Sequence, residues 1–281
     1  MFTDKVIEMI LVGIKDTLYM TLVSTVFGYV LGLPLGVILN VTRKDGLKPN
    51  SVIYGTIGFI CNIIRSIPFL ILLILLIPFT RFLVGQSYGS TATIVPLVIC
   101  AAPYIARVVE SSLNEVDAGV IEAAKAMGAS NFQIIFKVLL AEARVSLFTG
   151  ATITTGLLLG YSAMSGTVGG GGLGDIAVRY GYYRWQTDIM IVTVLLLIII
   201  FQIIQHLGTR FSRRIDHRKR SGIRYGYRSH KKISAAFFKG VPADDKDRLA
   251  GYRARVRTRY RMRVYNVLQT ARAVSDRKVL R

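Results

Sequence analysis

Cysteine is scarce in this chain of 281 residues, which contains only Cys61 and Cys100. Both lie in long apolar runs, where a free thiol behaves as a small hydrophobic side chain. Two isolated cysteines provide neither a disulfide framework nor the close ligand spacing of a metal site. We therefore expect two buried thiols and no metal centre.

Residue patterns that catalysis requires are also missing. The chain has no G-x-x-x-x-G-K-[ST] sequence, so it does not carry an ATP site of that type. Its three histidines, His206, His217 and His230, have no carboxylate or serine partner at the spacing of a catalytic motif. The sequence predicts a protein that is not an enzyme and that takes no cofactor.

Acidic residues are few, 16 against 36 Lys and Arg, and the formal net charge is +20. The imbalance is local, because residues 210–281 hold 23 of the basic residues and only five of the acidic ones. We interpret 210–281 as a basic cytoplasmic tail, either disordered or adsorbed to anionic lipids of the membrane. Association with nucleic acid is the least favoured interpretation of the tail.

The rest of the chain is dominated by long apolar runs. The mean hydropathy of the whole chain is +0.46, which is too high for an ordinary soluble domain. Five segments are long enough to cross a membrane, at about 17–41, 52–79, 91–109, 145–164 and 189–207. The sequence therefore predicts an all-α membrane protein with a transmembrane domain over 13–209, whose second span is long enough to be tilted or broken. Glu110 and Asp188 fall near span ends, so paired carboxylates for a proton-driven transporter are missing.

The loop charges predict the orientation of the spans. Basic residues concentrate on one side, in the first and third loops and after the last span: Arg43, Lys44, Lys48, Arg107, Lys125, Lys137, Arg144, Arg210, Arg213, Arg214, Arg218, Lys219 and Arg220. The other side has only Lys5, Lys15, Arg81, Arg179 and Arg184. Because cytoplasmic loops carry the excess of Lys and Arg, we expect an external N-terminus and a cytoplasmic tail in the inner (plasma) membrane.

Two features inside the predicted spans stand out. Gly28, Gly32 and Gly36 recur every four residues, a spacing that lets another helix approach closely, either within one subunit or across a dimer. Arg65 is a basic residue in an apolar run, beside Ser66 and Pro68. It is either an intramembrane charge at a break in the second span, or a side chain that reaches the cytoplasmic boundary.

The segment 113–142 is too charged to cross a membrane and is patterned as two short helices. Asp117 is placed to cap the first helix, and Gly128 to end it in a left-handed conformation. Ser130 and Gln133 predict a capping box that opens the second helix. The expected apolar stripes are Val116, Val120, Ala123 or Ala124, and Met127 in the first helix, and Phe132, Ile135, Phe136 and Leu139 in the second. Such a segment either lies on lipid headgroups or docks into a groove of a cytoplasmic partner.

This segment resembles a motif of binding-protein-dependent ABC importer permeases. The resemblance lies in Glu122-Ala123-Ala124, then Gly128, Val138 and Leu140, although Ala141 stands where the family has proline. It extends over roughly 11–211, where RSIPFLILLILLIPFTRFLVG, APYIARVVESSLNEV and GYSAMSGTVGGGGLGDIAVRYGY are similar to the methionine-importer branch. The resemblance implies a type I importer permease fold in which the Glu122–Gly128 helix couples to a separate ATPase.

The same resemblance implies the partners and the substrate. These are a second copy of the chain, two copies of a cytoplasmic ABC ATPase subunit, and an external substrate-binding lipoprotein. The implied substrate is methionine, in its D or L form, with another small amino acid as the alternative. An ATP-independent channel or carrier is the competing hypothesis, and a membrane-anchored nucleic-acid-binding protein is a second one that rests only on the tail.

Two further motifs lie near the outer end of the fourth span. Met164, with Tyr161 and Ser162, is a candidate for an apolar gate on the translocation path, with ordinary packing against a neighbouring span as the alternative. Gly169, Gly171 and Gly174 match G-x-G-x-x-G, but no strand is expected before them. We interpret these glycines as an external hairpin with unusual backbone angles rather than a nucleotide site.

Overall fold

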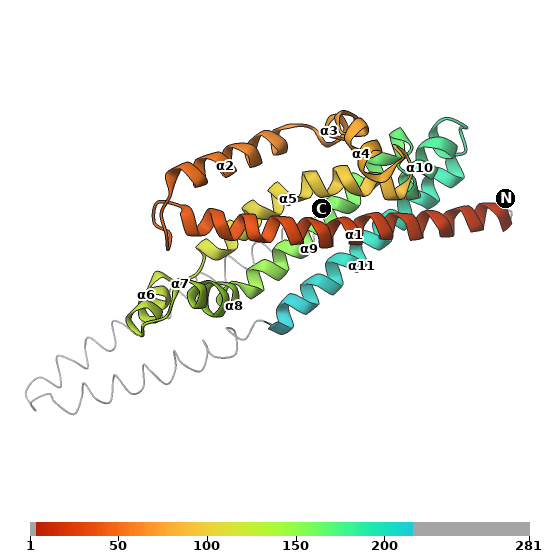
Figure 1. Cartoon of the computed structure of the whole chain (residues 1–281). Helices are drawn as coiled ribbons and strands as arrows, with labels where there is room; N and C mark the ends of the chain where they lie inside the picture. The colour runs from red at the N-terminus through yellow and green to blue at the C-terminus, as the bar shows by residue number, and fades with distance from the viewer. Residues whose placement is uncertain (1–3, 216–281) are drawn as a thin grey trace, which may run out of the picture. The chain divides into compact units, whose positions relative to one another are not determined.

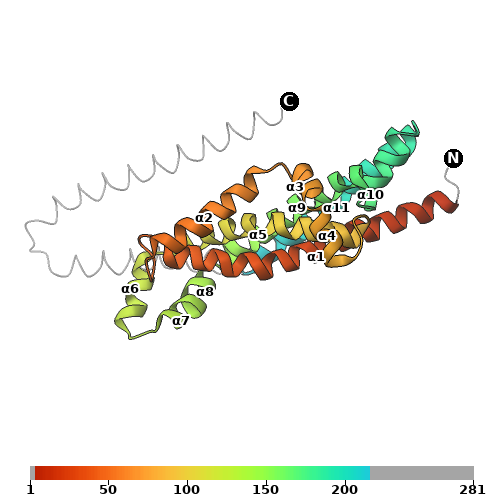
Figure 2. The same cartoon turned by 45° about the horizontal axis from the view of Figure 1, so that its top comes forward.

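The computed structural model describes residues 4–215, and every regular element in that range is helical. Four helices are long and apolar enough to cross a membrane: α1 (Asp4–Thr42), α5 (Ser90–Asn114), α9 (Arg144–Ser165, continued by the 3₁₀ turn η2, Gly166–Val168) and α11 (Thr187–Ile215). They run side by side in one bundle (Figures 1 and 2). The predicted all-α fold is confirmed, and the predicted tail lies outside the described residues from 216 onward.

The second predicted span is a broken helix. α2 (Ser51–Ser66) and α3 (Phe69–Leu75) meet at an angle of 101°, and α4 (Ile77–Val84) follows. The break has a local cause, because the residue before a proline is disfavoured in helical conformation. Ile67, before Pro68, is accordingly extended, with φ −82° and ψ 125°. The described range therefore has four membrane-length helices, or five if the broken pair counts as one span.

α1 starts well before the predicted span of 17–41. Its 39 residues correspond to about 58 Å of helix, roughly twice the thickness of the hydrocarbon core. The N-terminal turns pack on α10 (Gly172–Ile176), where the Leu173 N–H donates to Thr17 Oγ1 at 2.8 Å. The π-helical segment η3 (Ala177–Tyr182) continues from α10. The hydropathy pattern does not report this contact between α1 and α10.

The repeated glycines of α1 face α5. A Cβ atom at Gly32 would lie 2.7 Å from the carbonyl oxygen of Ala102, and one at Gly36 would lie 2.6 Å from that of Ala106. These separations are too short for any side chain, so glycine is needed where the two backbones approach. Of the two alternatives for Gly28, Gly32 and Gly36, the structure places these residues in a contact within one subunit.

α9 lies between α1, α5 and α11 and joins them through hydroxyl groups. Ser146 Oγ donates to Ser112 Oγ on α5 at 3.0 Å, and Thr149 Oγ1 lies 2.8 Å from Ser212 Oγ on α11. The short helices α6 (Ala118–Ala126), α7 (Asn131–Gln133) and α8 (Leu140–Glu142) connect α5 to α9, with the π-helical η1 (Ile134–Leu139) between α7 and α8. They lie at the end of the bundle where α1 ends, opposite α3, α4 and α10 (Figures 1 and 2).

Candidate functional site

The first short helix of the connecting segment has the predicted caps at both ends. Asp117 Oδ1 accepts a hydrogen bond from the Gly119 N–H at 2.7 Å, which satisfies one free donor at the start of α6. At the other end, Gly128 has a φ of +80°, the left-handed conformation that ends the helix without strain only in residues such as glycine. The Ala129 N–H then closes the turn on the Ala124 carbonyl at 3.1 Å.

The second part of the segment opens with the predicted capping box. The Ser130 N–H donates to Gln133 Oε1 at 2.9 Å, and the Gln133 N–H donates to Ser130 Oγ at 3.3 Å. Two reciprocal bonds of this kind fix the direction in which the chain enters the helix. Together with the left-handed Gly128, they set the angle between α6 and α7.

The apolar stripe predicted for this second part is wrong in its register. Phe132 and Phe136 are exposed, and their ring centroids are 4.4 Å apart on the surface. Leu139, which the prediction included, is buried, but so is Ile134, which the prediction left out. The reason is the π-helical turn, in which residues five apart share a face, whereas the prediction assumed an α-helical period.

α6 buries one side against the bundle and leaves the other side free. Val116 and Ala124 are buried in the main apolar cluster of the protein, as one edge of the predicted stripe requires. Val120 and Met127 belong to the same predicted stripe but are exposed, with 81% of Met127 accessible. Glu122, Ala123 and Gly128 are exposed as well.

The rest of the described protomer therefore leaves several apolar residues of α6, α7 and η1 uncovered. Val120, Met127, Phe132 and Phe136 are each between 42% and 81% accessible. A short, doubly capped helix with unpaired apolar side chains beside a solvated carboxylate has the chemistry of a helix that docks into a groove. We call residues Asp117–Phe136 the docking segment.

The three residues proposed for a gate do not share one surface. Met164 is 47% exposed in the last turn of α9, and Tyr161 stacks on Phe69 of α3 with ring centroids 4.5 Å apart. Ser162 is fully buried; its hydroxyl donates to the Leu159 carbonyl at 2.8 Å and lies 3.4 Å from Thr21 Oγ1 of α1. Ser162 thus belongs to a contact between α1 and α9, not to an open surface of this protomer.

The glycine-rich turn has the unusual backbone angles that the sequence predicts. Gly169 and Gly171, together with Gly172, have φ between +78° and +80°, whereas Gly174 of the predicted motif lies inside α10 and has no positive φ. A 3₁₀ turn precedes them and α10 follows, so in the described range the strand that a dinucleotide site requires is not there. The Gly169 carbonyl accepts a hydrogen bond from the Gly89 N–H at 2.9 Å, which ties this turn to the start of α5.

Arg65 lies in the last turn of α2, directly before the break at Pro68, and it is exposed. Because α2 starts at the end of the bundle that holds α6–α8, the whole length of α2 separates Arg65 from that end (Figure 1). Arg65 therefore lies at the break in the second predicted span, as the first of its two interpretations requires.

Sequence reasoning missed a polar network between α2 and α5. Arg107 Nη1 lies 2.8 Å from Glu110 Oε2, and Glu110 Oε1 accepts a hydrogen bond from the Tyr54 hydroxyl at 3.0 Å. Arg107 Nη2 also donates to the Gly58 carbonyl at 3.2 Å. The i, i+3 spacing of Arg107 and Glu110 was the only available signal, since their partners lie about fifty residues earlier in the chain.

Comparisons with known proteins cover most of the chain but not residues 222–281 in the family match. Residues 32–221 match the family described as "Binding-protein-dependent transport system inner membrane component". The "Probable D-methionine transport system permease protein MetI" of Vibrio cholerae is 50% identical over 211 residues, which cover 75% of this chain and 94% of that protein. The "D-methionine transport system permease protein MetI" of Escherichia coli K12 is 55% identical over 154 residues, covering 55% of this chain and 71% of that one.

Among solved structures, a chain of the inward-facing "MetNI methionine ABC transporter" superposes with a TM-score of 0.76. It is 48% identical, and the match covers 77% of this chain and 100% of that chain. A chain of a crystallised amino acid ABC transporter superposes with a TM-score of 0.63 at 21% identity, over 76% of this chain and 100% of that one. The second likeness concerns the fold alone.

Proposed function

Since the chain belongs to the family of binding-protein-dependent transport system inner membrane components, we propose that it forms the membrane path of an ATP-driven importer of methionine. The substrate is inferred from relatives that are 50% identical and carry the name of a D-methionine permease, and from the 48% identity to the chain of a methionine ABC transporter. In this proposal the chain is a transport subunit, and a separate ATPase hydrolyses ATP. The proposal includes both the D and the L form of methionine as substrates of the importer.

The observation that carries the proposal is the docking segment. Its helix ends are fixed by Asp117, Gly128 and the Ser130–Gln133 box, yet Val120 and Met127 stay exposed in the described part of the protomer. A partner that binds this exposed apolar face can displace the segment, and the displacement then moves the helices that pack on its buried face. Ala124 and Ile134, packed in the same apolar cluster, join this element to α5 and α9.

The geometry also supports a cytoplasmic location for the docking segment. Arg43 Nη1 donates to Asn114 Oδ1 at 2.7 Å, so the end of α1 adjoins the end of α5. Ser212 Oγ donates to the Val145 carbonyl at 3.3 Å, so the end of α11 adjoins the start of α9. The loops and helix ends that carry most of the basic residues therefore converge at the end of the bundle that holds α6–α8, and that end is the cytoplasmic one in our proposal.

Two copies of the chain form the path in this proposal. The described part of one protomer, residues 4–215, offers at most five spans, and a route between two copies on a two-fold axis needs no further helices. Met164, half-exposed at the opposite end of α9 from the docking segment, is the candidate for a gate near that axis. The proposed partners are two ATPase subunits on the cytoplasmic side and a substrate-binding lipoprotein on the outside.

The test is uptake of methionine into proteoliposomes that contain this chain, its cognate ATPase and the substrate-binding protein. We expect accumulation that requires ATP and all three components. Uptake by the purified chain without the ATPase would instead identify an ATP-independent carrier. ATP-dependent uptake of a different amino acid, with no uptake of methionine, would refute methionine as the substrate. It would still support an ATP-driven importer.

A further inference from the structure

Arg65 carries a charge inside the second predicted span that the proposed function leaves unused. The separation between Ser51, where α2 starts after the first basic loop, and Arg65 corresponds to about 21 Å of helix, against about 30 Å for the hydrocarbon core. Beyond the break, residues 67–79 contain no polar side chain. Apolar chain therefore lies on both sides of Arg65, which places its guanidinium at membrane depth.

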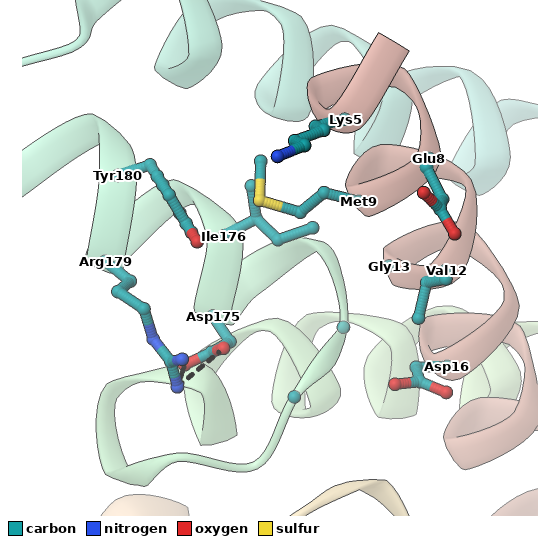
Figure 3. Close-up of a pocket in the computed structure, with 12 residues that line it drawn as sticks. Lys5, Glu8, Met9, Val12, Gly13, Asp16, Asp175, Ile176, Arg179 and Tyr180 are labelled. Carbon is teal, nitrogen blue, oxygen red and sulfur yellow. Dashed lines mark hydrogen bonds and ion pairs between the residues drawn. The ribbon is translucent and has the colours of Figure 1, made fainter.

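The guanidinium of Arg65 has no counter-charge in the described part of the protomer. Arg107 is paired with Glu110 at 2.8 Å. Arg179, at the outer end of the molecule, is paired with Asp175 at 3.0 Å (Figure 3). Among residues 4–215, no carboxylate lies within ion-pair distance of Arg65, and its side chain is exposed. An unpaired charge at this depth faces water or an anion, because contact with hydrocarbon is costly.

α2 has a polar face on the side of Arg65. Gly58, Asn62 and Arg65 are spaced by four and three residues, so they share one face of the helix, on which Asn62 and Arg65 are exposed. Arg107 Nη2 donates to Asn62 Oδ1 at 3.4 Å, so α5 adds a second guanidinium to this face. Ile63, two residues before Arg65, points to the other side of α2 and is 47% exposed. The uncovered surface of α2 thus has a polar side that suits a water-filled path and an apolar side that suits lipid.

The break in the second predicted span starts directly after Arg65. Ser66 is the last residue of α2, Ile67 is extended, and α3 leaves at an angle of 101°. Ser66 and Pro68 are exposed in the protomer. At membrane depth, non-helical backbone is tolerated where it is buried in protein or lines a water-filled cavity. The exposed break therefore indicates the same surroundings as the unpaired charge beside it.

We propose that Arg65 lines the translocation path and binds the carboxylate of the amino acid in transit. This step rests on the proposed function, in which the path runs between two copies of the chain. A guanidinium binds a carboxylate through two parallel N–H···O bonds, and every free amino acid carries that group. Phe69, next to the break, stacks on Tyr161, which lies one helical turn before Met164. Arg65 thus lies on the cytoplasmic side of the candidate gate, where it receives the substrate once the gate opens.

The phosphate of a lipid headgroup is the other anion that an exposed arginine can bind. A side chain that faces lipid would be surrounded by apolar residues, whereas Asn62 and Ser66 beside Arg65 are polar and exposed. The polar face and the break both favour the path. Whether water reaches position 65 separates the two anions, because only the path is filled with water.

The access of water is measured with single thiols on α2. The two buried native thiols are removed by Cys61→Ala and Cys100→Ala, and this background is the reference for each variant. Arg65→Cys and Ile63→Cys then place a thiol at nearly the same depth on opposite sides of α2. A charged methanethiosulfonate, present on both sides of the proteoliposome membrane, reacts with the thiolate form. We expect reaction at position 65 and at least about tenfold slower reaction at position 63, since hydrocarbon strongly disfavours the thiolate.

Recognition of the carboxylate is measured by restoring the charge at position 65. Arg65→Cys should reduce the number of amino acid molecules imported per ATP hydrolysed by roughly tenfold, the effect of losing hydrogen bonds between charged groups. Reaction of its thiol with 2-aminoethyl methanethiosulfonate adds an ammonium group and should recover part of the import. The 2-sulfonatoethyl reagent adds a negative charge and should recover none. If Arg65 served packing alone, the sign of the added charge would not matter.

The matched control is another exposed arginine of the same predicted region. Arg81 lies in the last turn of α4, beyond the break, and the proposal gives it no contact with the substrate. Arg81→Gln should import at the native ratio.

Two outcomes would overturn the proposal. Protection of position 65 from the reagent, equal to that of position 63, would place Arg65 in lipid and assign its partner to a headgroup phosphate. A native import ratio in Arg65→Cys, or equal recovery with either adduct, would show that its charge does not recognise the substrate.

These failures differ from a failure of the proposed function, because the native protein is measured beside the variants. A native chain that imports an amino acid other than methionine keeps the carboxylate contact, which is then measured with that amino acid. A native chain with no ATP-driven import would refute the proposed function and the carboxylate contact with it. The thiol reactivities would still show whether position 65 lines a water-filled path.

Discussion

Arg107 and Glu110 form an ion pair inside α5, with 2.8 Å between Nη1 of Arg107 and Oε2 of Glu110. The pair also holds α2, because Glu110 accepts from Tyr54 and Arg107 donates to the Gly58 carbonyl. Glu110 is 7% exposed, so these partners supply hydrogen bonds that water cannot. A Cβ atom at Gly58 would lie 3.0 Å from Arg107 Nη2, so a side chain at this position would shift the guanidinium slightly.

Removal of one member of this network should destabilise the protein more than removal of the pair. Arg107→Ala leaves a buried carboxylate without its cation, at a cost of about 3 kcal/mol in the free energy of unfolding. Arg107→Ala combined with Glu110→Ala should recover part of that loss, while Tyr54→Phe should cost only about 1 kcal/mol. The measurement is a double-mutant cycle on thermal unfolding in detergent. Additive effects of the two alanine substitutions would show that Arg107 and Glu110 do not stabilise each other.

Because α1 and α5 are in close contact, we expect a single added methyl group at Gly36 to lower the stability of the protein. Gly36→Ala places a Cβ atom 2.6 Å from both the Ala106 carbonyl oxygen and Val109 Cβ, so the helices must separate. We expect a loss of about 1–3 kcal/mol in stability, as for other overpacked contacts. Gly55→Ala on α2 is the control, because no atom lies within 4 Å of its added Cβ. Equal melting temperatures of the two variants would contradict the contact.

Met164 is expected to seal the path between substrate deliveries. Met164→Ala removes the exposed thioether at the end of α9 and should let methionine leak through proteoliposomes in the absence of ATP. Met164→Leu keeps an apolar side chain of similar volume and should remain tight. Passive efflux of labelled methionine measures the leak. An alanine variant as tight as the native protein would leave Met164 with a packing role only.

The segment beyond residue 222 is expected to be dispensable for transport. The family match ends at residue 221, and 23 of the 36 Lys and Arg residues lie in 210–281. A chain truncated after Gly222 should insert in the membrane and import methionine at the native rate. Uptake is compared at equal amounts of membrane protein. A stable, inserted truncation that has lost uptake would assign the tail a role in transport.

The features that the sequence predicted well are local ones. Asp117, Gly128, and the Ser130–Gln133 box are each set by a few neighbouring residues, and the structure contains all of them. The break in the second span follows from the single proline at position 68 in the same way.

The features that the sequence missed depend on distant partners or on an irregular helical period. Ile134 replaces Phe132 and Phe136 in the buried face because η1 is π-helical, and an α-helical pattern cannot reveal that insertion. Ser162 is buried because Thr21, 141 residues away, lies opposite it. The contact between Thr21 and Ser162 forms only when α1 packs against α9, so the local sequence does not predict it.

The central claim, that the docking segment couples ATP hydrolysis to transport, is tested most directly at Gly128. Gly128 has a φ of +80°, which a β-branched side chain adopts only with strain, whereas asparagine tolerates it. Gly128→Val should therefore change the angle between α6 and α7, while Gly128→Asn should preserve it. Neither substitution alters a membrane-length helix.

The measurement is the number of methionine molecules imported per ATP hydrolysed, in proteoliposomes that contain the ATPase and the substrate-binding protein. We predict a native ratio for Gly128→Asn and, for Gly128→Val, a ratio reduced at least severalfold or loss of the ATPase during purification. A Gly128→Val protein that inserts normally, retains the ATPase and imports methionine at the native ratio would contradict the claim.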